Sequence, residues 1–318
     1  MPIPSTASLG KVMPLRRSEL FLWLASLVAR HQLRKIFTDG LPPSLHAPFL
    51  FLLNRRLGSE EYEVVRNIEG LRSEMAKRTD EFVGVFTEAG LVSATGVISS
   101  SANSPQGLTR IRSLTKVAQV SSVLPQWGMF LYLCANATGA KTILELGAGA
   151  GISGCYLASG KNCQRFITVE GSPERARLAE THLRQVAHNF ELVNASFDEA
   201  LDRILPTLRH GIDMAYIDGS KAKLANLHYF ERITPYLNAG CVVVFDDIHW
   251  SSAMWETWKT LRQWKGLTCA INAGRFGVCV WNGGTIQPRT YDLYKVAGVD
   301  MFVVKQLLES VKLRGPFT

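Results

Sequence analysis

The chain has 318 residues, of which 47% are apolar and 19% charged, and its formal net charge is +8. This composition excludes a disordered or fibrous protein, and the length suffices for one large domain or two modest ones. The positive charges are scattered without a run of five, which favours solvated surface over a dedicated nucleic-acid or membrane patch. The six cysteines lack C-x-x-C or zinc-type spacing, so we expect reduced thiols and a cytoplasmic protein.

The first 109 residues predict a helical N-terminal region. The apolar stretch Leu20–Ala29 is too short to span a bilayer, so an amphipathic helix is favoured over a transmembrane segment. Further helices are expected over Ser44–Leu57 and from Ser59 to about Arg78. Glycine and serine dominate between Ala89 and Thr109, which is typical of a lid or an interdomain connection. This region is expected to supply a lid, substrate contacts or a dimer contact.

Residues 110–281 show a regular pattern of predicted helices and strands. Arg110–Val123 and Gln126–Ala137 predict two helices. Short apolar runs then alternate with helical stretches, which predicts a parallel sheet with helices on both faces; the runs lie at 142–146, 166–170, 191–194, 213–217, 241–245, 267–271 and 276–280. Only four residues separate the last two runs, so they should form an antiparallel hairpin at the sheet edge. Residues 282–318 follow as a C-terminal extension with an amphipathic helix over Asp300–Leu313.

A glycine-rich turn follows the first of these strands, in TILELGAGAGISGCYLA. Gly149, Gly151 and Gly154 spell G-x-G-x-x-G, a pattern that holds a dinucleotide pyrophosphate at a helix N-terminus. The same stretch also reads E-x-G-x-G-x-G, in which Glu145 precedes Gly147 by two residues and faces a cationic cofactor. Glu145 favours the second interpretation, and a nicotinamide-binding sheet is not expected to finish with an antiparallel hairpin.

These features resemble the class I S-adenosylmethionine-dependent methyltransferases over residues 110–281. The resemblance implies an α/β fold, with a Rossmann-like seven-stranded methyltransferase sheet whose last strand is antiparallel. It also implies that Glu170, in ITVEGS, accepts hydrogen bonds from both ribose hydroxyls of the cofactor. Ser196 and Phe197 would contact the adenine. The implied cofactor-binding residues are Glu145, Gly147, Ala148, Gly149, Gly151, Glu170, Gly171, Ser196, Phe197 and Asp218.

Acidic residues end the next two strands, in AYIDGSKAK and VVVFDDIHW. Because parallel strand ends open on one edge of the sheet, these side chains should converge beside the cofactor. Adjacent carboxylates on a buried strand need a cation or hydrogen-bond donors, and carboxylate oxygens suit Mg²⁺. The pattern resembles metal-dependent O-methyltransferases of the catechol and caffeoyl-CoA type, with Asp247 in place of their asparagine. It implies Asp218, Asp246 and Asp247 as ligands of a divalent cation, and Lys221 and Asp218 as catalytic residues.

The string DDIHWS also resembles a bacterial methyltransferase group, in which His249 is an alternative general base or ligand. Trp250 and Trp255 lie near the predicted mouth of the site and are candidates to stack on a planar substrate.

The expected function is therefore S-adenosylmethionine-dependent, metal-assisted O-methylation of a small hydroxylated metabolite, by a chain that could form a homodimer through its terminal helices. One alternative is a metal-independent N- or C-methyltransferase of a small molecule or peptide-like natural product, which would use Asp218, Asp246 and His249 as acceptors or base. The other is a non-catalytic cofactor-binding or RNA-associated subunit. The sequence lacks a basic-aromatic repeat and an N-P-P-Tyr motif, which disfavours nucleic acid as the partner.

Overall fold

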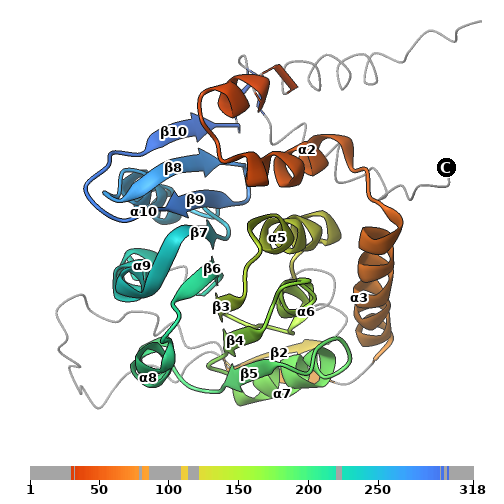
Figure 1. Cartoon of the computed structure of the whole chain (residues 1–318). Coiled ribbons are helices and arrows are strands. Elements are labelled where there is room, and N and C mark those ends of the chain that lie inside the picture. The colour runs from red at the N-terminus through yellow and green to blue at the C-terminus, as the bar shows by residue number, and fades with distance from the viewer. Residues whose placement is uncertain are drawn as a thin grey trace, which may run out of the picture.

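A computed structural model describes residues 30–31, 33–78, 81–85, 109–113, 122–219, 224–293, 295–296 and 299–300. Its centre is an eight-stranded sheet in the order β10-β8-β9-β7-β6-β3-β4-β5 (Figure 1). The strands are β3 (Thr142–Leu146), β4 (Arg165–Val169), β5 (Phe190–Val193), β6 (Ile212–Ile217), β7 (Leu237–Phe245), β8 (Leu267–Asn272), β9 (Gly277–Trp281) and β10 (Arg289–Asp292). All seven predicted strands are present, and the Rossmann-like methyltransferase architecture expected from the sequence is confirmed.

The hairpin formed by β8 and β9 differs from the expectation in its position. The two strands pair antiparallel as predicted, but β9 also pairs antiparallel with β7 and therefore lies inside the sheet. The edge beyond β8 is formed by the additional strand β10, which pairs parallel to it. As a result, the turn between β8 and β9 lies next to the carboxyl end of β7, where the acidic residues are.

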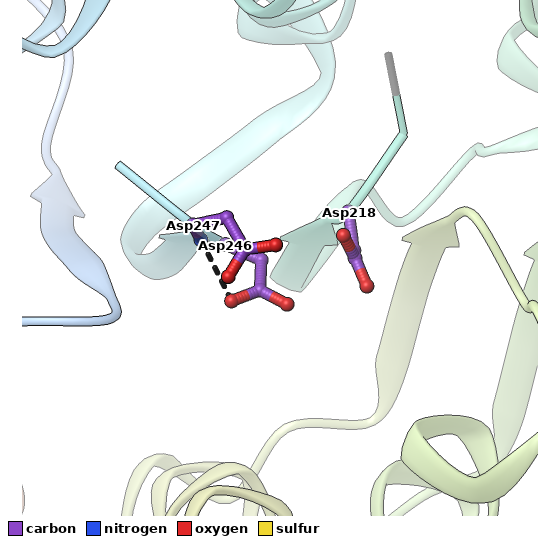
Figure 2. Close-up of side chains that lie close together, drawn as sticks. All are labelled: Asp218, Asp246 and Asp247. Carbon is purple, nitrogen blue, oxygen red and sulfur yellow. Dashed lines mark hydrogen bonds between the residues drawn. The ribbon is translucent and has the colours of Figure 1, made fainter. Parts of the chain in front are cut away.

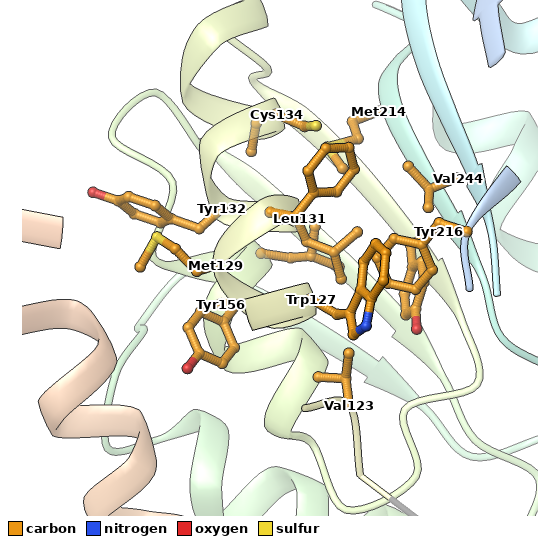
Figure 3. Close-up of a cluster of buried hydrophobic side chains, with 14 of the residues drawn as sticks. Val123, Trp127, Met129, Leu131, Tyr132, Cys134, Tyr156, Met214, Tyr216 and Val244 are labelled. Carbon is orange, nitrogen blue, oxygen red and sulfur yellow. The ribbon is translucent and has the colours of Figure 1, made fainter. Parts of the chain in front are cut away.

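Helices cover both faces of the sheet, because successive strand residues point to opposite sides. On one face lie α5 (Pro125–Thr138), α6 (Ile152–Ala158) and α7 (Pro173–Leu183), packed on strand residues such as Tyr216 and Val244. Figure 3 shows the α5 side of this core, with Trp127 and Tyr216 among the buried side chains. On the other face lie α8 (Phe197–Ile204), α9 (Ala225–Ile233) and α10 (Ser252–Leu261).

The described N-terminal helices join the core on the α5 face. They are α2 (His46–Asn54), preceded by a short 3-10 turn at Pro43–Leu45, and α3 (Ser59–Lys77). Phe49 packs edge-on against Phe130 of α5, and the Tyr156 hydroxyl donates a 3.0 Å hydrogen bond to Glu69 of α3. The N-terminal region, as far as it is described, therefore shares the hydrophobic core of the methyltransferase fold.

The helix predicted over Arg110–Val123 is wrong at its N-terminal end. Residues Thr109–Ser113 form strand β2, which pairs antiparallel with β1 (Glu81–Val85), although a helix was expected from Arg110. This two-stranded pairing crosses the expected domain boundary at residue 109. The glycine- and serine-rich stretch expected as a lid lies outside the described residues.

Part of the C-terminal extension is described. It contains β10 and the short antiparallel pair β11 (Lys295–Val296) and β12 (Val299–Asp300), whereas the helix expected over Asp300–Leu313 lies outside the described residues after its first position. Among the helices that the structure describes, none has the length and apolar character needed to cross a membrane. All six cysteines are free thiols.

Candidate functional site

The glycine-rich turn packs tightly against two neighbouring elements. The N–H groups of Gly147 and Ala148 both donate to the carbonyl of Val169, so the turn folds over the end of β4. At Gly147, where φ is +107°, a Cβ would lie 2.2 Å from the carbonyl oxygen of Asp218. At Gly151, where φ is +83°, it would lie 2.7 Å from the backbone of Ala179 in α7. Glycine is required at both positions by close approach as well as by backbone conformation.

Glu145 lies beneath this turn with its carboxylate fully buried. The hydroxyls of Ser153 and Thr168 each donate a 2.6 Å hydrogen bond to it. A Cβ at Gly154 would lie 3.0 Å from a Glu145 oxygen, so the third glycine of the G-x-G-x-x-G pattern leaves room for this carboxylate. Burial raises the pKa of Glu145 to about 7, although the two hydroxyls act in the opposite direction. The acidic residue of the motif therefore supports the turn from below.

Glu170 lies at the carboxyl end of β4, directly beside the turn. Its Oε2 accepts the N–H of Gly149 at 2.8 Å, and its Oε1 accepts the N–H of Ser172 at 2.9 Å. Each carboxylate oxygen can accept a further hydrogen bond. The side chain is thus fixed in orientation while it keeps acceptor capacity for a ligand.

The residues expected to contact adenine have structural roles in this arrangement. Ser196 caps α8 in a reciprocal capping box with Glu199, in which the Ser196 hydroxyl and N–H both bond the Glu199 carboxylate. Phe197 is half-buried and packs against Gly219, where an added Cβ would lie 2.0 Å from the ring. Its ring also meets Tyr229 edge-on at 5.2 Å between centroids. Phe197 therefore forms a wall next to the strand end that carries Asp218.

The three aspartates that follow β6 and β7, Asp218, Asp246 and Asp247, lie close together as predicted. Figure 2 shows Asp218 at the end of β6 facing the adjacent pair Asp246 and Asp247 at the end of β7. One carboxylate oxygen from each lies within 4.8 Å of the others. Asp246 is completely buried, whereas Asp218 and Asp247 are partly exposed. The carboxyl ends of β6 and β7 thus form an acidic cluster beside the glycine-rich turn.

Asp246 is surrounded by hydrogen-bond donors. Arg275, from the turn between β8 and β9, donates two hydrogen bonds of 2.7 Å to it, from Nε to Oδ1 and from Nη2 to Oδ2. The Tyr216 hydroxyl donates to Oδ2 at 2.9 Å, and the N–H of Asp247 donates to Oδ1 at 2.7 Å. Burial alone would lower the pKa of Arg275, but the Asp246 charge raises it above its usual value.

The arrangement does not fit the expected divalent cation at Asp246. A carboxylate offers about four lone-pair directions, and four donors already point at this one. The three oxygen ligands would suit Mg²⁺ by their chemistry, but the most buried of them is already paired with a guanidinium. The donors around Asp246 therefore occupy the positions that a metal ion would need.

His249 and the two tryptophans follow the acidic pair. His249 Nε2 lies 3.1 Å from Asn272 Oδ1, and its ring stacks on Trp255 with 4.5 Å between centroids. Trp255 is partly buried against the core, whereas the side chain of Trp250 is 70% exposed. Lys221, the other expected base, lies outside the described residues.

Sequence reasoning did not identify Arg275 or Tyr216 as part of the site. The only sequence signal was the Asp-Asp pair, whose adjacent charges require compensation, together with a single cationic residue in the turn at 272–275.

Residues 144–248 match a family described as methyltransferase domain. A catechol O-methyltransferase of Mycobacterium tuberculosis is 36% identical over 131 residues, which cover 40% of this chain and 57% of the relative. A catechol O-methyltransferase of Niastella koreensis is 32% identical over 132 residues, covering 40% and 58%. Among solved structures, an O-methyltransferase from Bacillus cereus in complex with SAH aligns with a TM-score of 0.45 at 20% identity, covering 52% of this chain and 84% of the other.

The matched segment includes the glycine-rich turn, Glu170 and all three aspartates of the cluster. The chain spans somewhat more than half the length of these curated relatives. Within this segment the resemblance to class I S-adenosylmethionine-dependent methyltransferases of the catechol O-methyltransferase type is confirmed.

Proposed function

We propose that this chain transfers a methyl group from S-adenosylmethionine to a hydroxyl oxygen of a small molecule. The observation that carries the proposal is the position of Glu170, at the carboxyl end of β4 and bonded to the glycine-rich turn through Gly149. A carboxylate at this point of a doubly wound sheet accepts hydrogen bonds from ribose hydroxyls. The match to catechol O-methyltransferases favours oxygen as the acceptor atom.

In this proposal the turn holds the methionine part of the cofactor. The open backbone at Gly149, where an added Cβ would meet nothing within 4 Å, allows close approach of a ligand. Glu145 supports the turn from beneath through its bonds to Ser153 and Thr168. Phe197 would border the adenine, and Asp218 would lie between cofactor and acceptor.

His249 is the proposed general base. Asn272 Nδ2 donates to Asp292 Oδ1, and Asn272 Oδ1 accepts the N–H of Gly274, so the amide is held with its oxygen toward His249. An amide oxygen only accepts hydrogen bonds, so the nitrogen facing it, Nε2, carries the proton. In the neutral imidazole the basic lone pair is then on Nδ1, the nitrogen that would take the proton of the acceptor hydroxyl.

The reaction balances without a further reactant. The acceptor hydroxyl would give its proton to His249 Nδ1, and bound S-adenosylmethionine would supply the methyl group to the acceptor oxygen. A C–O bond would form as the C–S bond of the cofactor breaks, and the products would be a methyl ether, S-adenosylhomocysteine and a protonated base. The exposed ring of Trp250 is available to stack on a planar acceptor. Homodimer contacts through the terminal segments, and a role for Lys221, stay predictions.

The proposal is tested with the full chain in two steps. Isothermal titration calorimetry with S-adenosylhomocysteine should show one site, and labelled methyl groups should pass from S-adenosylmethionine to simple catechols. His249→Ala should lower kcat by about 100-fold, as expected for a general base, with unchanged affinity for S-adenosylhomocysteine. The matched control, His210→Ala in an exposed loop, should leave both quantities unchanged.

A chain that does not bind S-adenosylhomocysteine would refute the proposed cofactor and would favour a different role for the turn. Binding with transfer only to nitrogen or carbon acceptors would retain the cofactor and refute the hydroxyl acceptor. Binding without transfer to any acceptor class would support the non-catalytic alternative.

A further inference from the structure

Arg275 reaches the acidic cluster from a distant part of the sequence. It lies in the turn between β8 and β9, and because β9 is inserted next to β7, this turn is brought to the carboxyl end of β7. Its side chain is 17% exposed, and that of Asp246 is completely buried. The ion pair between Arg275 and Asp246 is therefore largely shielded from solvent.

The guanidinium provides the positive charge that the cluster requires. Its Nε and Nη2 bond the two oxygens of Asp246, and Nε lies 3.5 Å from an oxygen of Asp247. A parallel two-bond contact of this kind is the geometry that arginine forms with carboxylates. Arginine stays protonated at every physiological pH, so the charge is permanent.

The remaining acceptor positions of Asp246 are also taken. Tyr216 and the N–H of Asp247 fill one position on each oxygen. A divalent ion could bind Asp246 only by displacing at least one of these donors. It would also place two positive charges beside a buried guanidinium, which like-charge repulsion opposes.

We propose that Arg275 takes the place of a divalent cation at the end of β7, so that the Asp218, Asp246 and Asp247 cluster binds no metal ion and the acceptor site works without one. The inference about the acceptor site rests on the proposed function, whereas the inference about metal binding does not. Arg275 acts as a positioning residue, because it holds Asp246 and Asp247 in a fixed arrangement at the carboxyl end of β7. Removing its charge should turn the three aspartates into a divalent-cation site.

The test is a Mn²⁺ titration of the full chain, followed by electron paramagnetic resonance of free Mn²⁺. Wild type should show no stoichiometric site up to millimolar Mn²⁺, and its thermal midpoint should be the same in EDTA and in Mn²⁺. Arg275→Met should gain one site per chain and bind Mn²⁺ at least about tenfold more tightly than wild type. The gain should disappear in the double variant Arg275→Met with Asp246→Asn.

Arg232→Met is the matched control, because Arg232 also bridges two carboxylates, Asp198 and Asp202, away from the cluster. It should gain no Mn²⁺ site. The wild-type titration keeps the proposal falsifiable even where Arg275→Met fails to fold. A stoichiometric Mn²⁺ site in wild type that is lost in Asp246→Asn would overturn it, as would a folded Arg275→Met chain that gains none.

These measurements use neither cofactor nor acceptor. A failed methyl-transfer assay therefore leaves the inference about metal binding standing, and a wild-type Mn²⁺ site would leave the proposed methyl transfer standing.

Discussion

Two acidic regions lie on the same edge of the sheet, and they compensate buried carboxylates in different ways. At the ends of β3 and β4, Glu145 and Glu170 accept hydrogen bonds from hydroxyls and backbone N–H groups, all of which are neutral. At the end of β7, Asp246 is paired with the guanidinium of Arg275. The partners of Glu170 beside the turn thus cancel none of its charge, whereas Arg275 cancels part of the charge of the second region within the fold.

This difference indicates which region can receive an incoming cation. A sulfonium cofactor carries a positive charge, and it suits a turn beside Glu170, whose carboxylate is bonded by neutral N–H donors. A divalent metal needs carboxylates with open lone pairs, which Asp246 lacks. Residue type alone does not separate the two regions, because both present acidic side chains at the ends of buried strands. Their hydrogen-bond partners do.

The largest expected effect on stability is at Gly147, where the glycine-rich turn touches the backbone of Asp218 in the acidic cluster. Gly147→Ala should lower the free energy of unfolding by about 4 kcal/mol, because a left-handed backbone penalty adds to overpacking against the carbonyl of Asp218. Gly240→Ala is the control, since Gly240 has a similar φ of +84° but nothing within 4 Å of the added Cβ. Gly240→Ala should lower the free energy of unfolding by about 1 kcal/mol. Urea unfolding measures both; equal losses would show that close approach at Gly147 is unimportant.

A second test asks whether neutral donors suffice to keep Glu145 charged. The folded-state pKa of Glu145 is about 7, raised from 4.5 mainly by burial. The carboxyl form is thus favoured on folding, and its contribution to stability is present below pH 4.5 and is lost as pH rises through about 7. This loss amounts to about 3 kcal/mol.

The Glu145→Gln variant lacks this titration. Between pH 4.5 and pH 8, wild type should therefore lose about 3 kcal/mol of unfolding free energy relative to the variant. A difference that is independent of pH would indicate that the two hydroxyls keep Glu145 ionised.

The smallest expected effect is on cofactor affinity, and it concerns Glu170. Both oxygens of Glu170 accept a backbone N–H, from Gly149 and from Ser172. In Glu170→Gln one of these oxygens is replaced by an NH₂ group, which is a donor, so one of the two hydrogen bonds is lost. Affinity for S-adenosylhomocysteine should fall about tenfold, or about 1.4 kcal/mol. Glu191→Gln, on the exposed side of neighbouring β5, should leave it unchanged. Calorimetry gives both values, and an unaltered affinity in Glu170→Gln would remove Glu170 from the cofactor site.

The strands and the glycine-rich turn could be predicted from the sequence, because local patterns determine them. Apolar runs of five or six residues mark β3 and β6, and the glycine spacing matches the close contacts at Gly147 and Gly151. The convergence of Asp218 and Asp246 followed from sheet topology, since parallel strand ends share an edge.

Features that depend on distant pairing could not be predicted in the same way. Strand β2 was expected to be helical, because its partner β1 precedes it by more than twenty residues and no local signal marks the pairing. The bond between Arg275 and Asp246 depends on the insertion of β9 beside β7. The sequence indicated that the aspartates need compensation, but it did not distinguish a protein cation from a metal ion.

The insertion of β9 also constrains the order in which the chain can complete its fold. During synthesis the Asp246 carboxylate emerges 29 residues before the guanidinium that neutralises it. Until Arg275 has left the ribosome and the hairpin has docked, burial of this strand end carries an uncompensated charge. The acidic edge thus makes pairing along β7 wait for the hairpin of β8 and β9, which couples completion of the proposed active site to the docking of that hairpin.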